Sequence, residues 1–397
     1  MSPDKPLDLL VVTGCFPPAW SWGGQTRSIW NVCRGLQRAG ARVHVVTTNA
    51  DLDRSLDVPR RREEQGIDVT TARVLPGAAA IRYGLAPGLL PAIWRASGRA
   101  RLCVFQGIWT FLLLVGPRIC RLRGLPYVVM PRGTLEAISL GEKAGKKRLY
   151  MRWVEEANLR HAAAIQFASE DERRNSAAAI GDARVLVHPN ALDLQAPRPR
   201  GGAALRRRLG LGDRERLVGI SGRLHPRKGF EIIVPALAHC AQEVHLVAFG
   251  ADESGYARRI RELAEEAGVG PRVHLLGQLE AEALEDAYAG VDLLVMPSYG
   301  ESFGNTAIEA LAQGTEVLCS ERVPLGGWLA EHDLGRVVSE LTAERWGRAL
   351  ADWGERDDRF DGDRASRIVR SEFDLVASGR RLLDDYRRLL AGTRTAG

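Results

Sequence analysis

Short apolar runs alternate with longer stretches of helical periodicity along the whole chain. The runs are continuously apolar, which predicts strands buried on both faces of a parallel sheet, with helices as the crossover connections. The sequence therefore predicts an α/β fold in two doubly wound halves. The expected strands are residues 9–13, 42–47, 102–106, 127–130, 164–167 and 185–188, and then 217–221, 244–249, 272–276, 292–296 and 316–319.

Two domains are expected, because 397 residues exceed the size at which a single hydrophobic core usually stops growing. A proline- and glycine-rich stretch without periodicity, residues 195–202, reads as the linker between them. We expect a first domain over residues 1–195 and a second over 196–375. Residues 376–397 contain an amphipathic pattern and are expected to return to the first domain as a bridging helix.

The composition excludes several classes of protein. With 45% hydrophobic and 26% charged residues, the chain is a globular protein, neither disordered nor fibrous. The net charge is +6, but only five of the 55 basic residues are lysines, which is typical of GC-rich coding. The arginine excess alone therefore does not indicate binding to nucleic acid, and no such partner is expected. Six scattered cysteines without a C-x-x-C pair indicate core thiols in a reducing compartment and predict no metal site.

The location of the protein is constrained by its apolar segments. Residues 9–12 are too short for the core of a secretory signal. The longest apolar stretch, residues 102–117, is interrupted by Gln106 and falls short of the roughly 18 to 20 residues of a membrane span. We expect a cytoplasmic protein and leave open a peripheral contact with the inner membrane.

The most informative motif, residues 297–314, follows an expected buried strand and opens a helix that ends at Gly314. This order places Glu301 at the carboxyl end of a parallel strand. The amides of Phe303, Gly304 and Asn305 would lie at the helix N-terminus, where α/β sheets bind anions. Gly304 would let the backbone approach a ligand closely.

Glu309 is four residues after Asn305, and so on the same face of the expected helix, where it could accept hydrogen bonds from a ribose diol. The alternative is that Glu301 only interacts with the helix dipole and Glu309 is a solvated surface residue. The tight glycine-bounded loop after a buried strand favours the functional interpretation.

A second motif, residues 219–230, again leads from a strand through a glycine-rich loop to a helix. Arg223 offers a planar fork suited to phosphate oxygens, and Lys228 a compact charge at the helix entrance. The alternative is an ordinary basic loop. A lysine in a chain that otherwise uses arginine favours a specific role for Lys228.

The first loop, residues 16–28, contains Gly23 and Gly24 at the expected carboxyl edge of the first sheet. A single Gly-Gly pair is weak evidence, and its position is what makes it a candidate. Asp51 and Asp53 are expected to be an acidic pair in a loop without a role.

Together, Gly222-Arg223-x4-Lys228-Gly229 and Glu301-x7-Glu309 resemble the motifs of the family 4 retaining glycosyltransferases, which have the GT-B fold. The resemblance covers nearly the whole chain, including Gly23-Gly24 and the Pro189-Asn190 turn. It implies two facing Rossmann-like domains, with a nucleotide-diphosphate sugar bound mainly by the second as substrate. No resident cofactor and no metal are implied, since cations of the protein replace the metal.

The resemblance also implies roles for single residues. Arg223 and Lys228 would hold the diphosphate, and Glu309 the ribose. Glu301 would bind the transferred sugar, and the amides of Phe303 to Asn305 its phosphate. Gly23 and Gly24 would close on the phosphates from the first domain, and Gly277, Gln278 and Leu279 would contact the base. We expect the catalytic residues to be Glu301, Arg223 and Lys228.

Charge alone could drive the implied reaction. Breaking a glycosyl phosphate bond develops negative charge on a diphosphate, so fixed cations and a helix N-terminus lower the barrier electrostatically. The leaving phosphate itself can take the acceptor proton, and no protein nucleophile is required. We expect a sugar to be moved to a glycan or lipid-linked acceptor in the assembly of a bacterial surface polysaccharide.

The sequence departs from the family pattern on the acceptor side. Many relatives have a histidine followed by glycine near the reacting sugar, whereas this chain has Gln106-Gly107 and Arg132-Gly133 at the matching places. His188 and His225 lie near motifs, but isolated histidines are more often structural.

Residues 139–152 hold Lys143, Lys146 and Lys147 together with two arginines. A charge run is usually a solvated face, and the alternative is a contact with anionic lipid or with a lipid pyrophosphate acceptor. Four tryptophans could line an acceptor site or belong to the core: Trp20, Trp22, Trp109 and Trp153.

Two other functions fit the same architecture. One is a nucleotide-sugar epimerase or a phosphorylase, although no lysine has a convincing pyridoxal phosphate context. The other is a non-catalytic nucleotide-sugar-binding subunit, which the missing histidines would favour. The sugar, the base and the oligomeric state stay open.

Overall fold

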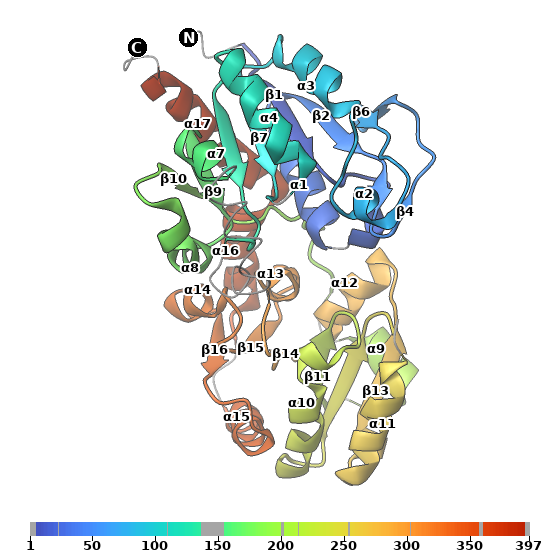
Figure 1. The fold of residues 1–397 in the computed structure, drawn as a ribbon. Helices are drawn as coiled ribbons and strands as arrows, with labels where there is room; N and C mark the ends of the chain where they lie inside the picture. The colour runs from blue at the N-terminus through green and yellow to red at the C-terminus, as the bar shows by residue number, and fades with distance from the viewer. Residues whose placement is uncertain are drawn as a thin grey trace. The chain divides into compact units, whose positions relative to one another are not determined.

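Two parallel sheets organise the computed structural model, each in its own unit (Figure 1). Unit 1 comprises Met1–Asp193 and Phe373–Gly397, and unit 2 comprises Leu194–Glu372. Both are doubly wound α/β units, so the predicted fold class is confirmed. The structure describes residues 5–22, 24–108, 110–135, 155–199, 202–212, 214–252, 255–301, 303–356 and 360–393.

Unit 1 is built on an eight-stranded sheet in the order β10-β9-β8-β7-β1-β2-β6-β5. All neighbouring strands pair in parallel except β5, which is antiparallel to β6. The strands are β1 (Asp8–Thr13), β2 (Arg42–Thr48), β5 (Arg61–Glu64), β6 (Ile67–Ala72), β7 (Leu102–Gln106), β8 (Tyr127–Met130), β9 (Ala164–Phe167) and β10 (Val185–Val187).

Strand β1 shows why the apolar runs are continuous. Leu9 and Val11 belong to one buried cluster, with side chains of helices α1 and α17, while Leu10 and Val12 belong to another, with α3 and α4. Both faces of the sheet are therefore covered, as the runs predicted. The helices are α1 (Gly24–Arg38), α2 (Ala78–Arg82), α3 (Leu89–Ser97), α4 (Phe111–Leu122), α7 (Glu156–Arg160), α8 (Glu170–Ile180) and α17 (Leu375–Thr393).

Several short strands were not predicted. β5 and β6 form a hairpin whose turn residues, Gln65 and Gly66, both have positive φ. β5 reads Arg-Arg-Glu-Glu and carries no hydrophobic signal. β3 (Ala50–Asp51) and β4 (Arg54–Ser55) form a two-stranded ladder. The expectation for Asp51 was wrong, because its buried carboxylate accepts hydrogen bonds from the backbone and hydroxyl of Ser21, in the first loop.

Unit 2 has a six-stranded parallel sheet in the order β13-β12-β11-β14-β15-β16. Its strands are β11 (Arg216–Ser221), β12 (Val244–Phe249), β13 (Val273–Gly277), β14 (Leu293–Met296), β15 (Glu316–Ser320) and β16 (Gly335–Val338). Its α-helices are α9 (Ala203–Leu209), α10 (Phe230–Ala236), α11 (Tyr256–Glu266), α12 (Ala281–Gly290), α13 (Asn305–Ala312), α14 (Gly326–Glu331), α15 (Ala343–Gly354) and α16 (Gly362–Phe373). β16, with two exposed residues, was not predicted.

Helix α17 completes unit 1 by packing against α1 through two glycines. A Cβ atom on Gly379 would lie only 2.1 Å from the carbonyl oxygen of Gly35, so the two backbones are in direct contact. Leu382, Leu383 and Tyr386 of α17 are buried in the same cluster as β1. The tyrosine hydroxyl donates to Gln166 Oε1 at 2.7 Å.

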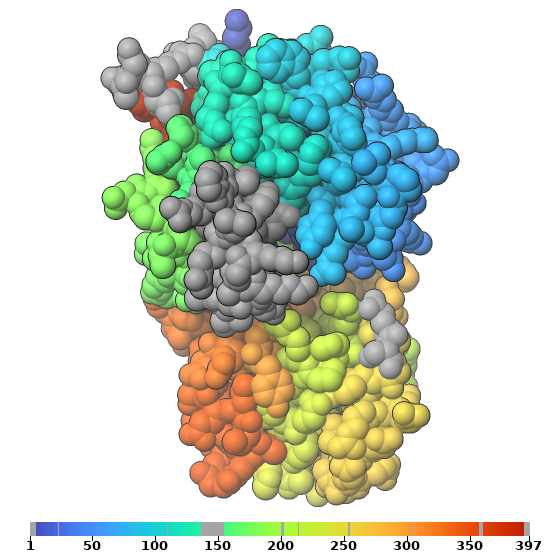
Figure 2. Space-filling model, viewed as in Figure 1, coloured from blue at the N-terminus to red at the C-terminus, as the bar shows by residue number. Residues whose placement is uncertain are grey.

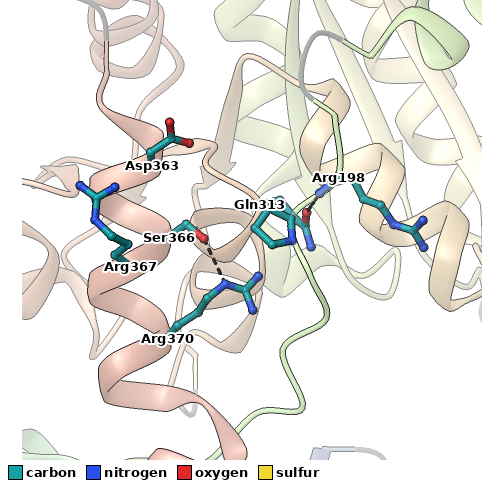
Figure 3. A pocket seen from close by; sticks show the side chains of 7 residues that line it. Arg198, Gln313, Asp363, Ser366, Arg367 and Arg370 are labelled. Atoms are coloured by element: carbon teal, nitrogen blue, oxygen red, sulfur yellow. Dashed lines mark hydrogen bonds between the residues drawn. The ribbon is translucent and has the colours of Figure 1, made fainter.

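The linker segment, residues 195–202, is held by the Arg370 side chain and by a backbone hydrogen bond of its own. Arg370 donates from Nη2 to the carbonyl oxygens of Gln195 and Ala312. Its Nε donates to Ser366 Oγ (Figure 3). The backbone N–H of Arg198 donates to Gln313 Oε1 at 2.7 Å. Arg198, Gln313, Ser366 and Arg370 line a pocket of about 530 Å³. The hydrogen bonds around it fix the linker to α16 and to the end of α13.

The six cysteines are all free and buried, which confirms them as core thiols. Burial raises the pKa of Cys33 and of Cys319 to about 12. Within the ranges that the structure describes, no helix is long and apolar enough to cross a bilayer.

Candidate functional site

The two predicted motifs of unit 2 follow neighbouring strands. β11 pairs with β12 on one side and with β14 on the other, so the strand order reverses between β11 and β14. In doubly wound sheets, ligands bind outside the carboxyl ends of the strands at such a switch point. Met296 ends β14 and is followed directly by the motif 297–314, while the motif 219–230 begins inside β11, which ends at Ser221.

The two loops touch through their backbones. A Cβ atom on Gly229 would lie 2.1 Å from the carbonyl oxygen of Pro297, so only glycine fits there, and its φ of 75° is also left-handed. The backbone N–H of Tyr299 donates to the carbonyl oxygen of Arg227 at 2.9 Å. The structure therefore brings together two motifs that are about 70 residues apart in the sequence.

Lys228 and Glu301 form an ion pair at this junction. Lys228 Nζ lies 2.8 Å from Glu301 Oε1, and each side chain keeps about a fifth of its surface exposed. Ser298 Oγ donates to the same carboxylate oxygen at 2.9 Å, and the carbonyl oxygen of Ser298 accepts from Ser320 Oγ. A side chain at Gly222 would collide with the lysine ammonium, at 2.8 Å. Both charged groups are thus fixed by packing and hydrogen bonds.

Helix α13 begins directly after the glutamate loop. Its N-cap is Gly304, with φ of 111° and without a side-chain cap. A Cβ atom on Gly304 would meet Val323 at 3.0 Å and Leu325 at 3.3 Å. Glycine is required here by the backbone and by these neighbours, a reason that differs from the expected approach of a ligand. Phe303 is buried and Asn305 is half-buried.

Asn305, the first residue of α13, has a side-chain oxygen that is buried and has no hydrogen-bond partner among the described residues. A buried oxygen without a donor costs free energy and calls for a partner such as water or a ligand. The feature lies beside the helix N-terminus that the sequence analysis singled out.

Glu309 is half-buried, so the solvated alternative is wrong. The hydroxyl of Tyr288, on α12, donates to Glu309 Oε2 at 2.8 Å and lies 2.8 Å from Ser221 Oγ at the end of β11. This chain of hydrogen bonds ties the first helix turns after β14 to the end of β11. Sequence analysis missed Tyr288, because a tyrosine in an alanine-rich helix carries no signal of such a contact.

The remaining donor-side candidates lie along the same sheet edge. Arg223 is exposed in the loop after β11. Gln278 is exposed and Leu279 half-buried, directly after β13. The loops of β11, β12 and β13 are joined at glycines, since Gly250 donates to the carbonyl oxygen of Gly277 and its α-carbon packs against Gly222. Two strands, β12 and β11, therefore lie between the strand that precedes Gln278 and the strand that precedes α13.

In unit 1, Gly24 is the first residue of α1, and a Cβ atom there would meet nothing within 4 Å. Gly23 lies outside the described residues, as do Trp109, Trp153 and the basic segment 139–152. Trp20 is half exposed, whereas the indole of Trp22 donates to the carbonyl oxygen of Ala50 at 3.3 Å.

The two departures from the family pattern belong to one hydrogen-bond network. Arg132 follows β8 with a left-handed φ of 59°, and its Nε donates to Gln106 Oε1 at 2.9 Å. Its Nη1 donates to Ser28 Oγ at 2.5 Å and to Asn190 Oδ1 at 3.1 Å. Arg132 therefore joins the carboxyl ends of β7 and β8 to α1 and to the Pro189-Asn190 turn.

The guanidinium of Arg132 is also incompletely paired. Burial lowers its pKa, and the negative charge of Glu172 opposes that shift. Nη2 is buried and has no hydrogen-bond partner among the described residues. His188, by contrast, is structural: it is buried, and its Nε2 lies 3.0 Å from Ser378 Oγ.

Comparison with known proteins gives matches over both units. Residues 23–191 match the model of a glycosyl transferase 4-like domain, and residues 203–365 match that of the glycosyl transferases group 1. D-inositol 3-phosphate glycosyltransferase of Rhodococcus jostii is 37% identical over 177 residues, which cover 41% of this chain and 39% of that protein. The matched region thus spans about two fifths of the length of this curated relative.

Solved structures match the fold over almost the full chain. HepE of Anabaena, in complex with UDP, is 20% identical with a TM-score of 0.76, covering 96% of this chain and all of that one. Sucrose-phosphate synthase of Thermosynechococcus elongatus is 22% identical with a TM-score of 0.73, covering 97% of this chain and all of that one. Two adjoining family models and this shared GT-B fold lead to one conclusion: the chain belongs to the glycosyltransferase enzymes built from a glycosyl transferase 4-like domain and a group 1 domain.

Proposed function

We propose that the protein is a retaining, metal-independent glycosyltransferase that moves a sugar from a nucleotide-diphosphate sugar to a glycan or lipid-linked acceptor in surface polysaccharide assembly. The observation that carries the proposal is the contact between the two switch-point loops of unit 2. This contact holds Lys228 and Glu301 2.8 Å apart beside the N-terminus of α13. HepE, which was solved in complex with UDP, supports the proposed class of donor.

Lys228 and Arg223 are proposed to hold the diphosphate. An ammonium group has three donors, so Lys228 can keep its bond to Glu301 while it donates to phosphate oxygens. The α13 N-terminus adds partial positive charge. As the glycosyl phosphate bond breaks, both contributions stabilise the charge that develops on the leaving diphosphate. The same cations are proposed to replace a metal ion.

Glu301 is proposed to bind the transferred sugar. Lys228 and Ser298 both donate their hydrogen bonds to Oε1 of Glu301. Among the described residues, Oε2 therefore stays available to accept a hydrogen bond from a sugar hydroxyl. Glu309 is proposed to accept from the ribose, held in place by Tyr288. Gln278 and Leu279 are proposed to contact the base, and Gly23 and Gly24 the phosphates.

Unit 1 is proposed to serve the acceptor through Arg132. Nη2 of Arg132 is buried, and no described residue accepts a hydrogen bond from it, so the cost of removing it from water is not repaid. A hydroxyl or phosphate group of the sugar acceptor could accept this hydrogen bond. The name of the curated relatives, which act on an inositol phosphate, supports an anionic acceptor.

A panel of nucleoside diphosphates in a thermal-shift assay tests the donor assignment, because a ligand of the folded state raises Tm with its affinity. We expect one or two diphosphates to raise Tm, and Arg223→Ala to abolish the rise. A panel without any shift contradicts the proposal. Transfer of radiolabelled sugar from the matching donor to a membrane extract then separates a transferase from a nucleotide-sugar-binding subunit.

A further inference from the structure

Acidic residues are missing from one long segment of unit 1. Residues 69–135 contain nine arginines and neither aspartate, glutamate nor lysine, while the remainder of the chain has 46 basic and 49 acidic residues. The preference of this chain for arginine over lysine does not explain the loss of acids. The whole positive net charge therefore originates in this segment, which favours an anionic partner.

The same segment exposes large apolar side chains. Six of the ten exposed large hydrophobic residues among those described belong to it: Leu75, Tyr83, Leu85, Leu90, Trp94 and Leu122. Leu90 and Trp94 are one helical turn apart on α3 and 42% and 45% exposed, and Leu122, at the end of α4, is 79% exposed. Scattered surface leucines are ordinary, but a gathering of them beside basic residues marks an interaction surface.

The exposed residues of α3 and the end of α4 are linked in space by one contact. The guanidinium of Arg123 lies 3.9 Å from the ring centroid of Trp94, and its Nη2 donates to the carbonyl oxygen of Trp94. This contact joins the end of α4 to the outer face of α3. Residues of this part of the chain, coloured cyan to teal, are at the surface of unit 1 in the view of Figure 2. We call Leu90, Trp94, Arg95, Leu122 and Arg123 the α3 face.

A basic cavity adjoins the α3 face. It has a volume of about 640 Å³, and its lining includes Arg101, Arg121, Arg123 and His161 and, as far as the described residues go, no acidic side chain. Its lining includes Arg101, directly before β7, and Tyr127, the first residue of β8. The cavity is therefore at the amino ends of these strands, whereas Gln106 and Arg132 are at their carboxyl ends. It belongs to a different site.

We propose that the α3 face and this cavity dock the protein on a bilayer that contains anionic lipid. The leucines and Trp94 enter the interfacial region, the flanking arginines pair with headgroups, and the cavity takes a lipid phosphate between its guanidinium groups. Exposed leucines favour a membrane over a nucleic acid, because single strands bind through stacked aromatic rings and duplexes through polar contacts. The proposal depends on neither the sugar donor nor the transfer reaction.

Vesicle flotation of the full chain, without donor, tests this docking surface. We expect binding to phosphatidylcholine vesicles with about one quarter phosphatidylglycerol, little binding to phosphatidylcholine alone, and weaker binding as salt is raised from about 0.1 to 1 M. The double variant Arg101→Gln/Arg123→Gln is expected to lose about tenfold or more in affinity, and Trp94→Ala/Leu122→Ser a similar factor.

The matched control is Arg261→Gln/Arg336→Gln, which removes the same charge from exposed positions of unit 2 and is expected to keep most of the affinity. Equal loss in this control, or equal binding to neutral vesicles, overturns the proposal. So does loss of binding only when Lys143, Lys146 and Lys147 are neutralised, which would assign the contact to residues 139–152. The proposal is also overturned if the protein binds inorganic phosphate but no vesicles. It is overturned as well if the protein binds RNA more tightly than vesicles and the variant Trp94→Ala/Leu122→Ser keeps that RNA binding.

Discussion

Lys228 Nζ and Glu301 Oε1 are 2.8 Å apart, although the two residues come from loops after different strands. The ammonium is thereby held in place before any ligand binds, so little side-chain ordering would remain for the diphosphate binding that we propose. A preorganised cation of this kind contributes most where charge develops during the reaction.

The first prediction concerns this pair. Lys228→Ala is expected to lower kcat for sugar transfer about 100-fold or more, because it removes a fixed cation from the leaving group. The ion pair is partly exposed, so the variant should unfold within a few degrees of the wild type. Arg227→Ala, in the same loop and exposed, is the control and should retain most activity. Wild-type kcat in Lys228→Ala would remove the lysine from the catalytic site.

The second prediction concerns Arg132. Arg132→Lys keeps the charge but loses the fork that joins Gln106, Ser28 and Asn190. We expect KM for the acceptor to rise about tenfold, with KM for the donor nearly unchanged, since one charged hydrogen bond is worth that much. Equal changes in both constants, with a lowered Tm, would show that Arg132 only supports the fold.

The third prediction concerns the contact between α1 and α17. Gly379→Ala places a methyl group where only 2.1 Å separates it from the carbonyl oxygen of Gly35, and should destabilise unit 1 by about 2 kcal/mol or more. Gly392→Ala on the same helix meets only the flexible end of Arg184, at 3.3 Å, and serves as the control. Urea unfolding measures both. Similar midpoints for the two variants would contradict the close packing.

The fourth prediction concerns pH and His188. Burial, assisted by the positive charge of Arg381 and opposed by Asp385, lowers the pKa of His188 to about 4. The unfolded state, with a pKa near 6.5, then binds more protons than the native state between these values. The contribution of His188 to the free energy of unfolding is complete above pH about 6.5. It falls by up to about 3 kcal/mol as the pH approaches 4.

Partial burial also lowers the pKa of the half-buried His44, His245 and His274, so the measurement is a comparison of slopes. We expect the free energy of unfolding of His188→Gln to fall less steeply with acid than that of the wild type. Parallel curves would show that His188 does not titrate in this range.

The strands could be predicted from the sequence wherever burial on both faces made the apolar run continuous. β7, β8, β9 and β12 have the expected bounds to the residue. β5 and β16 could not be predicted, because edge strands keep charged side chains in solvent and have no such run.

For the candidate site, the sequence predicted Glu301 at a strand end and Lys228 at a helix entrance, but it did not predict an ion pair between them. Their contact depends on β11 and β14 being neighbours, a matter of strand order that local patterns do not contain. Tyr288 was missed for the same reason, since its hydroxyl reaches Ser221 and Glu309 only after α12 has packed. The network of Arg132 likewise joins residues up to about 160 positions apart.

Because α17 supplies Leu382, Leu383 and Tyr386 to the core of unit 1, the ribosome must make all of unit 2 before unit 1 can be finished. At the usual rate of synthesis, the apolar face of α1 would then stay exposed for on the order of ten seconds or longer, until α17 has been made. During that interval the nascent chain would expose an aggregation-prone apolar surface. A chaperone that binds this surface would raise the yield of native protein.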